Sequence, residues 1–136
     1  FALDQPDYEA TYILKYLMKF WTEVFGEKKG SKIADAMDIA RGGFFTDIPS
    51  SYPEGAWYSY NDKTCDYACQ VTEYFYWSLT SLLGAQDFPG RFDEISHEWK
   101  ANTPGLVESM DSAVFSILTN PQYSLPTILP DGTYRQ

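Results

Sequence analysis

The residues best suited to acid–base or metal chemistry lie together at positions 93–98, which read Asp-Glu-Ile-Ser-His-Glu. Glu94 and His97 are three residues apart, so on a helix they would share one face, as in the Glu-x-x-His units of di-iron bundles. Such a site needs two of these units, and this chain has one histidine. A hydrolytic metal site built on Glu94, His97 and Glu98 would therefore need a distant ligand, such as a cysteine. The alternative, which we favour, is an exposed histidine beside acidic residues one turn earlier.

A second pattern has the ligand spacing of a calcium-binding loop. Oxygen-bearing side chains fill loop positions 1, 3, 5 and 12, namely Asp62, Thr64, Asp66 and Glu73. Position 6, where the sharp turn of such a loop requires glycine, is Tyr67. The alternative is a helix N-terminus at which Asp and Thr side chains cap backbone amides. We favour capping and keep calcium as the one cofactor for which the sequence offers a ligand pattern.

The two cysteines, Cys65 and Cys69, stand four residues apart in Cys-Asp-Tyr-Ala-Cys. A disulfide at this spacing is feasible at the first turn of a helix and strained inside a regular one. The chain begins with Phe1, which suggests a processed protein or a piece of a longer one. We therefore predict a disulfide between the two cysteines and an extracellular or other oxidising compartment.

Other catalytic patterns find little support in the sequence. No Gly-x-Ser-x-Gly turn surrounds a serine, and the glycines of Arg41-Gly42-Gly43 are better explained as a helix end than as a phosphate-binding loop. We assign no catalytic residue. A glycosidase-type pair of carboxylates stays open, because acidic residues are plentiful and their separation in space is not visible in a sequence.

The charge balance restricts the partners. Lys and Arg number 10 against 19 Asp and Glu, which gives a net charge of −9. Nucleic acid and anionic membrane surfaces both require a basic patch, which the scattered lysines and arginines do not form. The uncharged stretch at residues 74–86 is too short to span a bilayer. Cations, basic proteins and neutral ligands such as sugars fit this charge better.

Aromatic residues interleaved with Gly, Pro and Ser fill the loop at residues 51–60. Such a surface suits flat contacts with a sugar or a protein, although the rings could instead close one end of the helical layer. A second apolar and proline-rich stretch, residues 121–136, is predicted to form an extended arm that contacts its own body or a neighbouring subunit. The candidate contact residues of these two segments are Tyr52, Trp57, Tyr58, Tyr60, Tyr123 and Leu125.

Hydrophobic periodicity predicts a single all-α domain over residues 1–136, built from about five helices. The expected helices span residues 6–25, 31–41, 64–84, 89–99 and 103–120. The third is apolar almost all round, so we expect it at the centre. Its inner face is predicted to run through Cys69, Phe75, Leu79 and Leu82 and to be widened by Val71, Tyr74 and Trp77.

The sequence as a whole favours a non-catalytic interaction or assembly module of a secreted protein, with self-association through the arm. The alternative function is a metal-assisted hydrolytic enzyme that uses the Glu94, His97 and Glu98 cluster.

Overall fold

The computed structural model of this chain describes residues 18–130, and every regular element within that range is a helix. The all-α prediction is confirmed. The predicted helix at residues 6–25 is observed from residue 18 to residue 25, and its earlier part lies outside the described residues. The remaining elements are α2 (Lys32–Arg41), α3 (Tyr67–Leu82), α4 (Arg91–Ile95), α5 (Pro104–Met110), α6 (Ser112–Leu118) and a 3-10 turn at Pro121–Tyr123.

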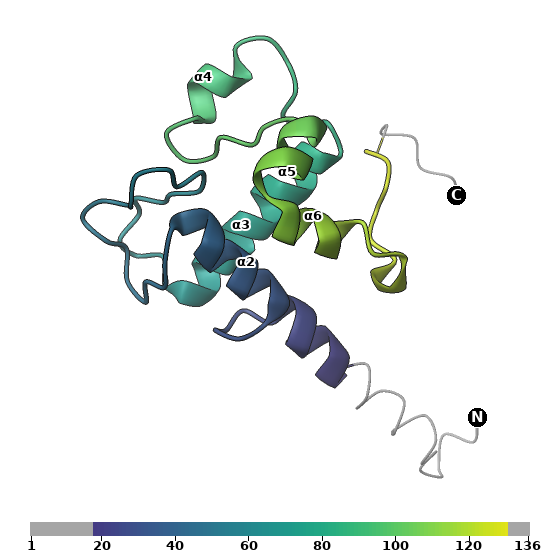
Figure 1. Cartoon of the computed structure of the whole chain (residues 1–136), viewed down its shortest axis with the longest axis horizontal. Helices are drawn as coiled ribbons and strands as arrows, with labels where there is room; N and C mark the ends of the chain where they lie inside the picture. Colours follow the sequence, from purple (N-terminus) through teal and green to yellow (C-terminus); the bar gives the residue numbers. More distant parts are fainter. Residues whose placement is uncertain (1–17, 131–136) are drawn as a thin grey trace.

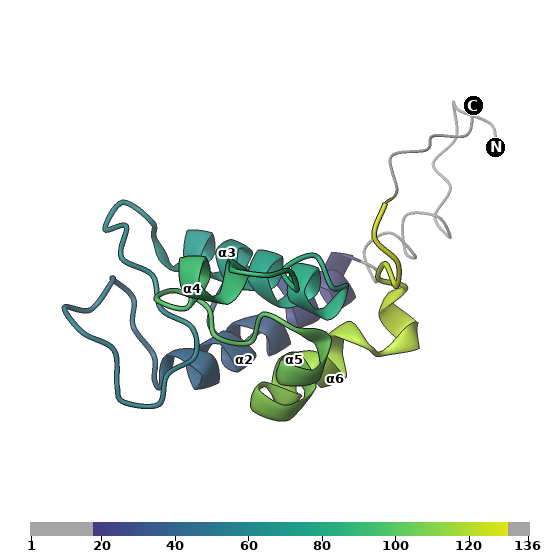
Figure 2. The ribbon, with the colours of Figure 1, turned by 90° about the horizontal axis from the view of Figure 1, so that it is seen from above.

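The core lies between α3 and a second layer formed by α2, α5 and α6, and α3 contacts all three of these helices (Figures 1 and 2). The short helix α4 stands away from this body on the chain between α3 and α5 (Figure 1). None of the helices in the described part of the chain has the length and apolar character needed to cross a bilayer.

The inner face of α3 agrees with the predicted one in part. Val71, Tyr74 and Trp77 are buried as predicted. Gln70, Ser78 and Ser81 are buried as well, whereas Leu79 is only half-buried. Polar and small side chains face inward here because the core uses them as partners. The Ser81 hydroxyl accepts a hydrogen bond from the Trp99 indole over 2.9 Å, and its small size leaves room for that ring.

The ends of α2 follow the sequence prediction. The Ser31 hydroxyl accepts from the Ala34 amide over 3.1 Å and caps the helix. Gly42 ends it with a left-handed φ of 83°, and a Cβ built there would lie 2.9 Å from the ring of Pro53. Glycine at this position therefore both ends the helix and lets the following loop return against it.

The predicted helix at residues 103–120 is broken into α5 and α6 at Asp111, whose side chain caps α6 by accepting from the Val114 amide. The predicted helix at 89–99 ends early, at Ile95. Trp99 lies beyond it, fully buried, and pairs with Tyr58 in an isolated antiparallel bridge. Phe92 of α4 is 45% exposed, because this helix stands away from the body.

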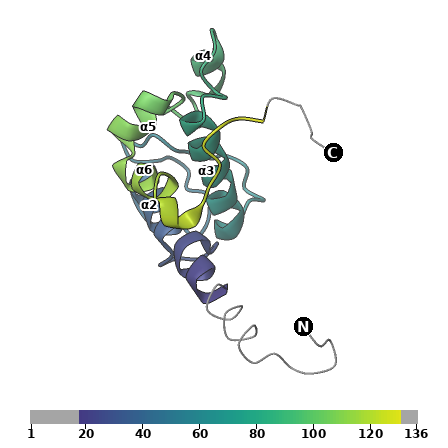
Figure 3. The ribbon, with the colours of Figure 1, turned by 90° about the vertical axis from the view of Figure 1, so that its right-hand side faces the viewer.

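Part of the predicted arm packs against the body of its own chain. After α6 the chain turns back (Figure 3), and the Tyr123 ring contacts Phe20 and Phe25 with ring centroids 5.5 and 5.4 Å apart. Leu125 is also half-buried against the core. By contrast, Ile128 is 80% exposed. Residues 131–136 of the predicted arm lie outside the described residues.

Candidate functional site

A cavity of about 340 Å³ lies where the aromatic loop meets the chain after α4, and we call it the loop pocket. Three segments line it, at residues 48–52, 59–63 and 97–98. The aromatic loop and the His97–Glu98 pair, which the sequence singled out separately, therefore form walls of one cavity.

The loop is fixed to its surroundings by backbone hydrogen bonds. The amides of Trp57 and Tyr58 donate to the carbonyl of Ala40, over 3.0 and 3.3 Å, at the end of α2. On the other side the Ser59 amide donates to the Glu98 carbonyl over 2.9 Å, and the Lys100 amide donates to the Trp57 carbonyl over 3.0 Å. These bonds hold the lining segment at residues 97–98 against the loop, independently of any ligand.

Trp57 and Tyr58 act as anchors of the loop. Tyr58 has no exposed surface, and its hydroxyl donates to the Gln70 carbonyl of α3 over 2.9 Å. Burial raises the pKa of the Tyr58 phenol far above its ordinary value, with a smaller contribution from the charges of Glu73 and Glu98. The Trp57 indole donates to the Asp111 carboxylate over 2.8 Å. Tyr58 is therefore part of the core, and Trp57 is half-buried against it.

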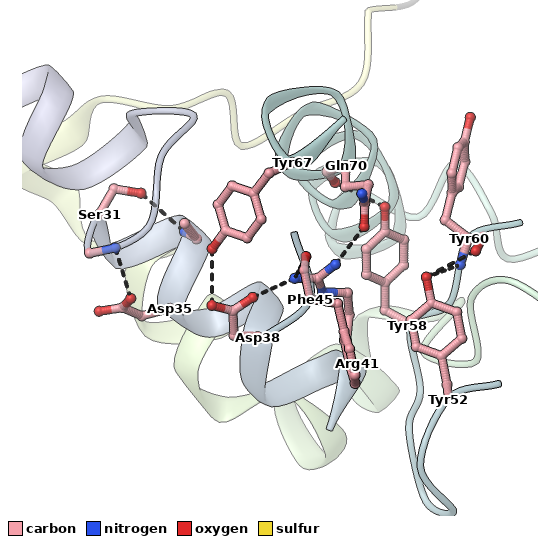
Figure 4. A network of polar contacts seen from close by, with 12 residues as sticks. Ser31, Asp35, Asp38, Arg41, Phe45, Tyr52, Tyr58, Tyr60, Tyr67 and Gln70 are labelled. Atoms are coloured by element: carbon pink, nitrogen blue, oxygen red, sulfur yellow. Dashed lines mark hydrogen bonds and ion pairs between the residues drawn. The ribbon is translucent and has the colours of Figure 1, made fainter. Parts of the chain in front are cut away.

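Tyr52 and Tyr60 lie at the pocket itself. The Tyr52 hydroxyl donates to the Tyr60 carbonyl over 2.9 Å and accepts from the Tyr60 amide over 3.2 Å (Figure 4). This pair of bonds holds two of the pocket's walls together. Burial raises the pKa of Tyr52, and the bond to Tyr60 and the nearby charge of Arg41 oppose that effect.

A buried arginine fixes the start of the loop. Arg41 has no exposed surface, and its guanidinium donates to Gln70 of α3, to the Asp38 carboxylate and to the Phe45 carbonyl (Figure 4). The Tyr67 hydroxyl donates to the second oxygen of Asp38 over 2.9 Å. The network joins α2, α3 and the first residues of the loop. The charge of Arg41 is thus paired with Asp38, and the start of the loop is bonded to the two helices.

His97 and Glu98 line the pocket, while Glu94 does not. Because α4 ends at Ile95, His97 lies in the following turn and does not share a helix with Glu94, whose carboxylate pairs with Arg91 over 2.9 Å. Glu98 is half-buried, and its carboxylate accepts a long hydrogen bond of 3.4 Å from the Trp77 indole. Burial raises the pKa of Glu98, against the effects of that bond and of His97.

The calcium-like pattern takes the geometry of helix capping. One Asp62 oxygen accepts from both the amide and the hydroxyl of Thr64, over 2.9 and 2.7 Å, and these bonds lower the pKa of Asp62. Asp66 caps α3 by accepting from the Cys69 amide over 2.9 Å, and Glu73 lies within α3. Over residues 18–130, no three His, Cys, Asp or Glu side chains gather closely enough to hold a metal ion.

Cys65 and Cys69 form a disulfide, with Cα atoms 5.3 Å apart, at the first turn of α3 as predicted. Cys65 is buried, and its carbonyl accepts from the side-chain amide of Gln70 over 3.1 Å. The bridge thus lies beside the Arg41 network. A disulfide fits an oxidising compartment.

The sequence interpretation missed the rest of the pocket lining, which is contributed by residues without a motif of their own: Ile48, Pro49, Ser50, Ser59, Asn61 and Lys63. Lys63 could have been noticed in the sequence, because it is the only Lys or Arg between Arg41 and Arg91. The other lining residues become visible only through the fold.

Comparison of the chain with protein-family models, with curated proteins and with solved structures finds no match. The function is therefore argued from the loop pocket and its residues alone.

Proposed function

We propose that this chain is a non-catalytic binding module of an extracellular or other oxidising compartment, and that the loop pocket takes a short sugar. The observation that supports this most directly is the convergence of the aromatic loop and the His97–Glu98 pair on one cavity.

The size and lining of the loop pocket suit a sugar ring. Its volume of about 340 Å³ lies at the lower end of the range of roughly 300–1,000 Å³ for small-molecule sites. Ile48, Pro49 and the Tyr60 ring offer apolar surface for the C–H face of a sugar, and Ser50 and Asn61 offer partners for its hydroxyl groups. Because backbone bonds hold the loop in place, little ordering cost opposes binding.

The same lining gives less support to catalysis. Glycosidases commonly place two carboxyl groups on either side of the scissile bond, and Glu98 is the single carboxyl group among the described residues that line the pocket. The metal-assisted alternative would require Glu94, which pairs with Arg91 and does not line the pocket. Binding without chemistry is therefore the function we argue.

The histidine offers a direct test, because the chain has only one and its imidazole resonances need no further assignment. We expect short oligosaccharides, titrated into the protein, to shift the His97 resonances in a saturable manner. Tyr60→Ala should weaken the affinity obtained from this titration at least about tenfold, because it removes the ring on which the sugar would stack. Tyr76→Ala, which removes an exposed tyrosine of α3 that does not line the pocket, should leave it unchanged. A panel of neutral and acidic sugars without any saturable shift would disprove this function.

A second contact surface is favoured by the exposed end of the arm. Ile128 is 80% exposed and Leu129 39% exposed, and both are apolar. We propose that these side chains mediate self-association, for which they are suited because a neighbouring subunit would remove them from water.

A further inference from the structure

The loop pocket offers several hydrogen-bond donors to a ligand, and two of them are on basic side chains. Two of its hydroxyl groups are already engaged: that of Tyr52 bonds to the Tyr60 backbone, and that of Ser59 donates to the His97 carbonyl over 2.7 Å. The remaining lining includes the ammonium group of Lys63, which offers three donors and no acceptor.

Asn61, Tyr60 and His97 add further N–H and O–H donors to the same lining. Ser50, Tyr60 and Asn61 also carry acceptor oxygens, and the Glu98 carboxylate, an acceptor alone when ionised, already accepts from Trp77. Lys63 is a donor alone, so a ligand that bonds to it must present an acceptor there.

Two of the donors are basic side chains. Lys63 forms no ion pair with any carboxylate of the described residues, so its charge is available to a ligand. His97, the single histidine of the chain, is the second basic group at the pocket. In a protein of net charge −9, a lysine and the only histidine thus lie at the same cavity.

From this placement we infer that the ligand of the loop pocket is an acidic sugar, with a ring carboxylate bound between Lys63 and His97, an inference that rests on the sugar-binding function proposed above. The ring would lie against Tyr60, and its hydroxyl groups would reach Asn61 and Glu98. The carboxylate supplies acceptor oxygens to both basic side chains, in bonds strengthened by charge.

The net charge of the protein does not prevent this binding. At physiological ionic strength, charges farther away than about 8 Å are largely screened, so the groups at the cavity decide the sign of the local field. A single negative charge is favoured over a phosphate monoester, which carries about −1.5 to −2 at neutral pH. The dianion would be repelled more strongly by Glu98 and by Glu73, whose charge acts on Glu98.

The test uses the methyl glycoside of galacturonic acid, which carries one negative charge, and its methyl ester, which carries none. Binding of each to the full chain is followed by the His97 resonances and by calorimetry. We expect the acid to bind at least about tenfold more tightly than the ester, and added salt to reduce this preference.

The Lys63→Ala variant should lose the preference for the acid while keeping the affinity for the ester, because the exposed Lys63 side chain contributes charge and not the ring contacts. Lys32→Ala, which removes an exposed lysine of α2 outside the pocket, is the matched control and should retain the preference.

Equal binding of acid and ester in the wild-type protein, with both lost in Tyr60→Ala, would overturn the acidic ligand and leave the sugar-binding function standing. A preference for the acid that survives Lys63→Ala would equally overturn the role of Lys63. Absence of binding by the acid, by its ester and by neutral sugars would refute both proposals.

Discussion

The Trp57 indole and the Tyr74 hydroxyl donate to the same oxygen of the Asp111 carboxylate, over 2.8 and 2.7 Å. Asp111 is 1% exposed, and its other oxygen accepts from the Val114 amide at the start of α6. One carboxylate therefore joins the aromatic loop to α3 and to the junction of α5 and α6. Asp111 lies at the break in the predicted helix at residues 103–120, and from this position its side chain reaches the loop, α3 and the start of α6.

Asp111→Ala should strongly destabilise the fold. The substitution leaves two donors without their acceptor, at about 1–3 kcal/mol each when buried, and removes a helix cap worth roughly 1 kcal/mol. We expect the free energy of unfolding in urea to fall by about 3–5 kcal/mol. Asp111→Asn keeps one carbonyl oxygen and should cost less, about 1–2 kcal/mol. Glu108→Ala, an exposed acidic residue of α5, serves as the control. A loss below about 1 kcal/mol for Asp111→Ala would show that water replaces the carboxylate.

The buried tyrosines should make the fold sensitive to alkaline pH. Burial raises the pKa of Tyr58 and Tyr74 well above the ordinary value of 10.0, and burial together with the bond to Asp38 does the same for Tyr67. In the folded protein these phenols stay neutral, whereas in the unfolded chain they lose their protons near pH 10. Their contribution to stability is therefore complete below pH 10 and is lost as the pH rises above it.

Tyrosinate absorbance and helical circular dichroism, recorded together during an alkaline titration, check this expectation. Part of the tyrosinate signal should appear only as the helical signal disappears. Tyr58→Phe should make the fall in unfolding free energy above pH 10 shallower, although it costs about 1 kcal/mol at neutral pH through the lost bond to Gln70. Complete ionisation of all tyrosines while the helices persist would contradict the buried positions.

The disulfide between Cys65 and Cys69 should protect both thiols from alkylation. Intact mass after alkylation without reductant should show no added groups, and reduction of the denatured protein should allow two. Because the bridge closes a short loop, with a sequence separation of 4, we expect its reduction to cost roughly 2 kcal/mol of stability. Uptake of two alkyl groups without a reductant would mean that the cysteines are free.

The parts of the fold that local sequence determines were predicted well. Ser31 and Gly42 mark the ends of α2, and Thr103 with Pro104 marks the start of α5, because capping depends on residues within one turn. The polar residues of the inner face of α3 were not predicted. Periodicity places apolar residues inward, whereas Gln70 and Ser81 are buried because they bond to Arg41 and Trp99.

The sequence identified several residues of the loop pocket but did not show that they line one cavity. Tyr60 and His97 were both singled out from the sequence, but nothing in the chain indicates that residues 37 positions apart line one cavity. That contact depends on the bridge between Tyr58 and Trp99, which is a tertiary pairing. The same pairing places Tyr58 in the core.

The arm provides the test of self-association. Since Tyr123 and Leu125 contact the body of their own chain, deletion of residues 121–136 should lower the melting temperature whatever the oligomeric state. Ile128→Asp separates the two roles, because this exposed side chain contributes little to the fold of its own chain. We expect the wild-type protein to self-associate in light scattering at high concentration, and Ile128→Asp to yield a folded monomer with an unchanged melting temperature. Ile39→Asp, an exposed isoleucine on α2, should leave the association intact. A wild-type protein that remains strictly monomeric at high concentration would exclude the arm as an assembly surface.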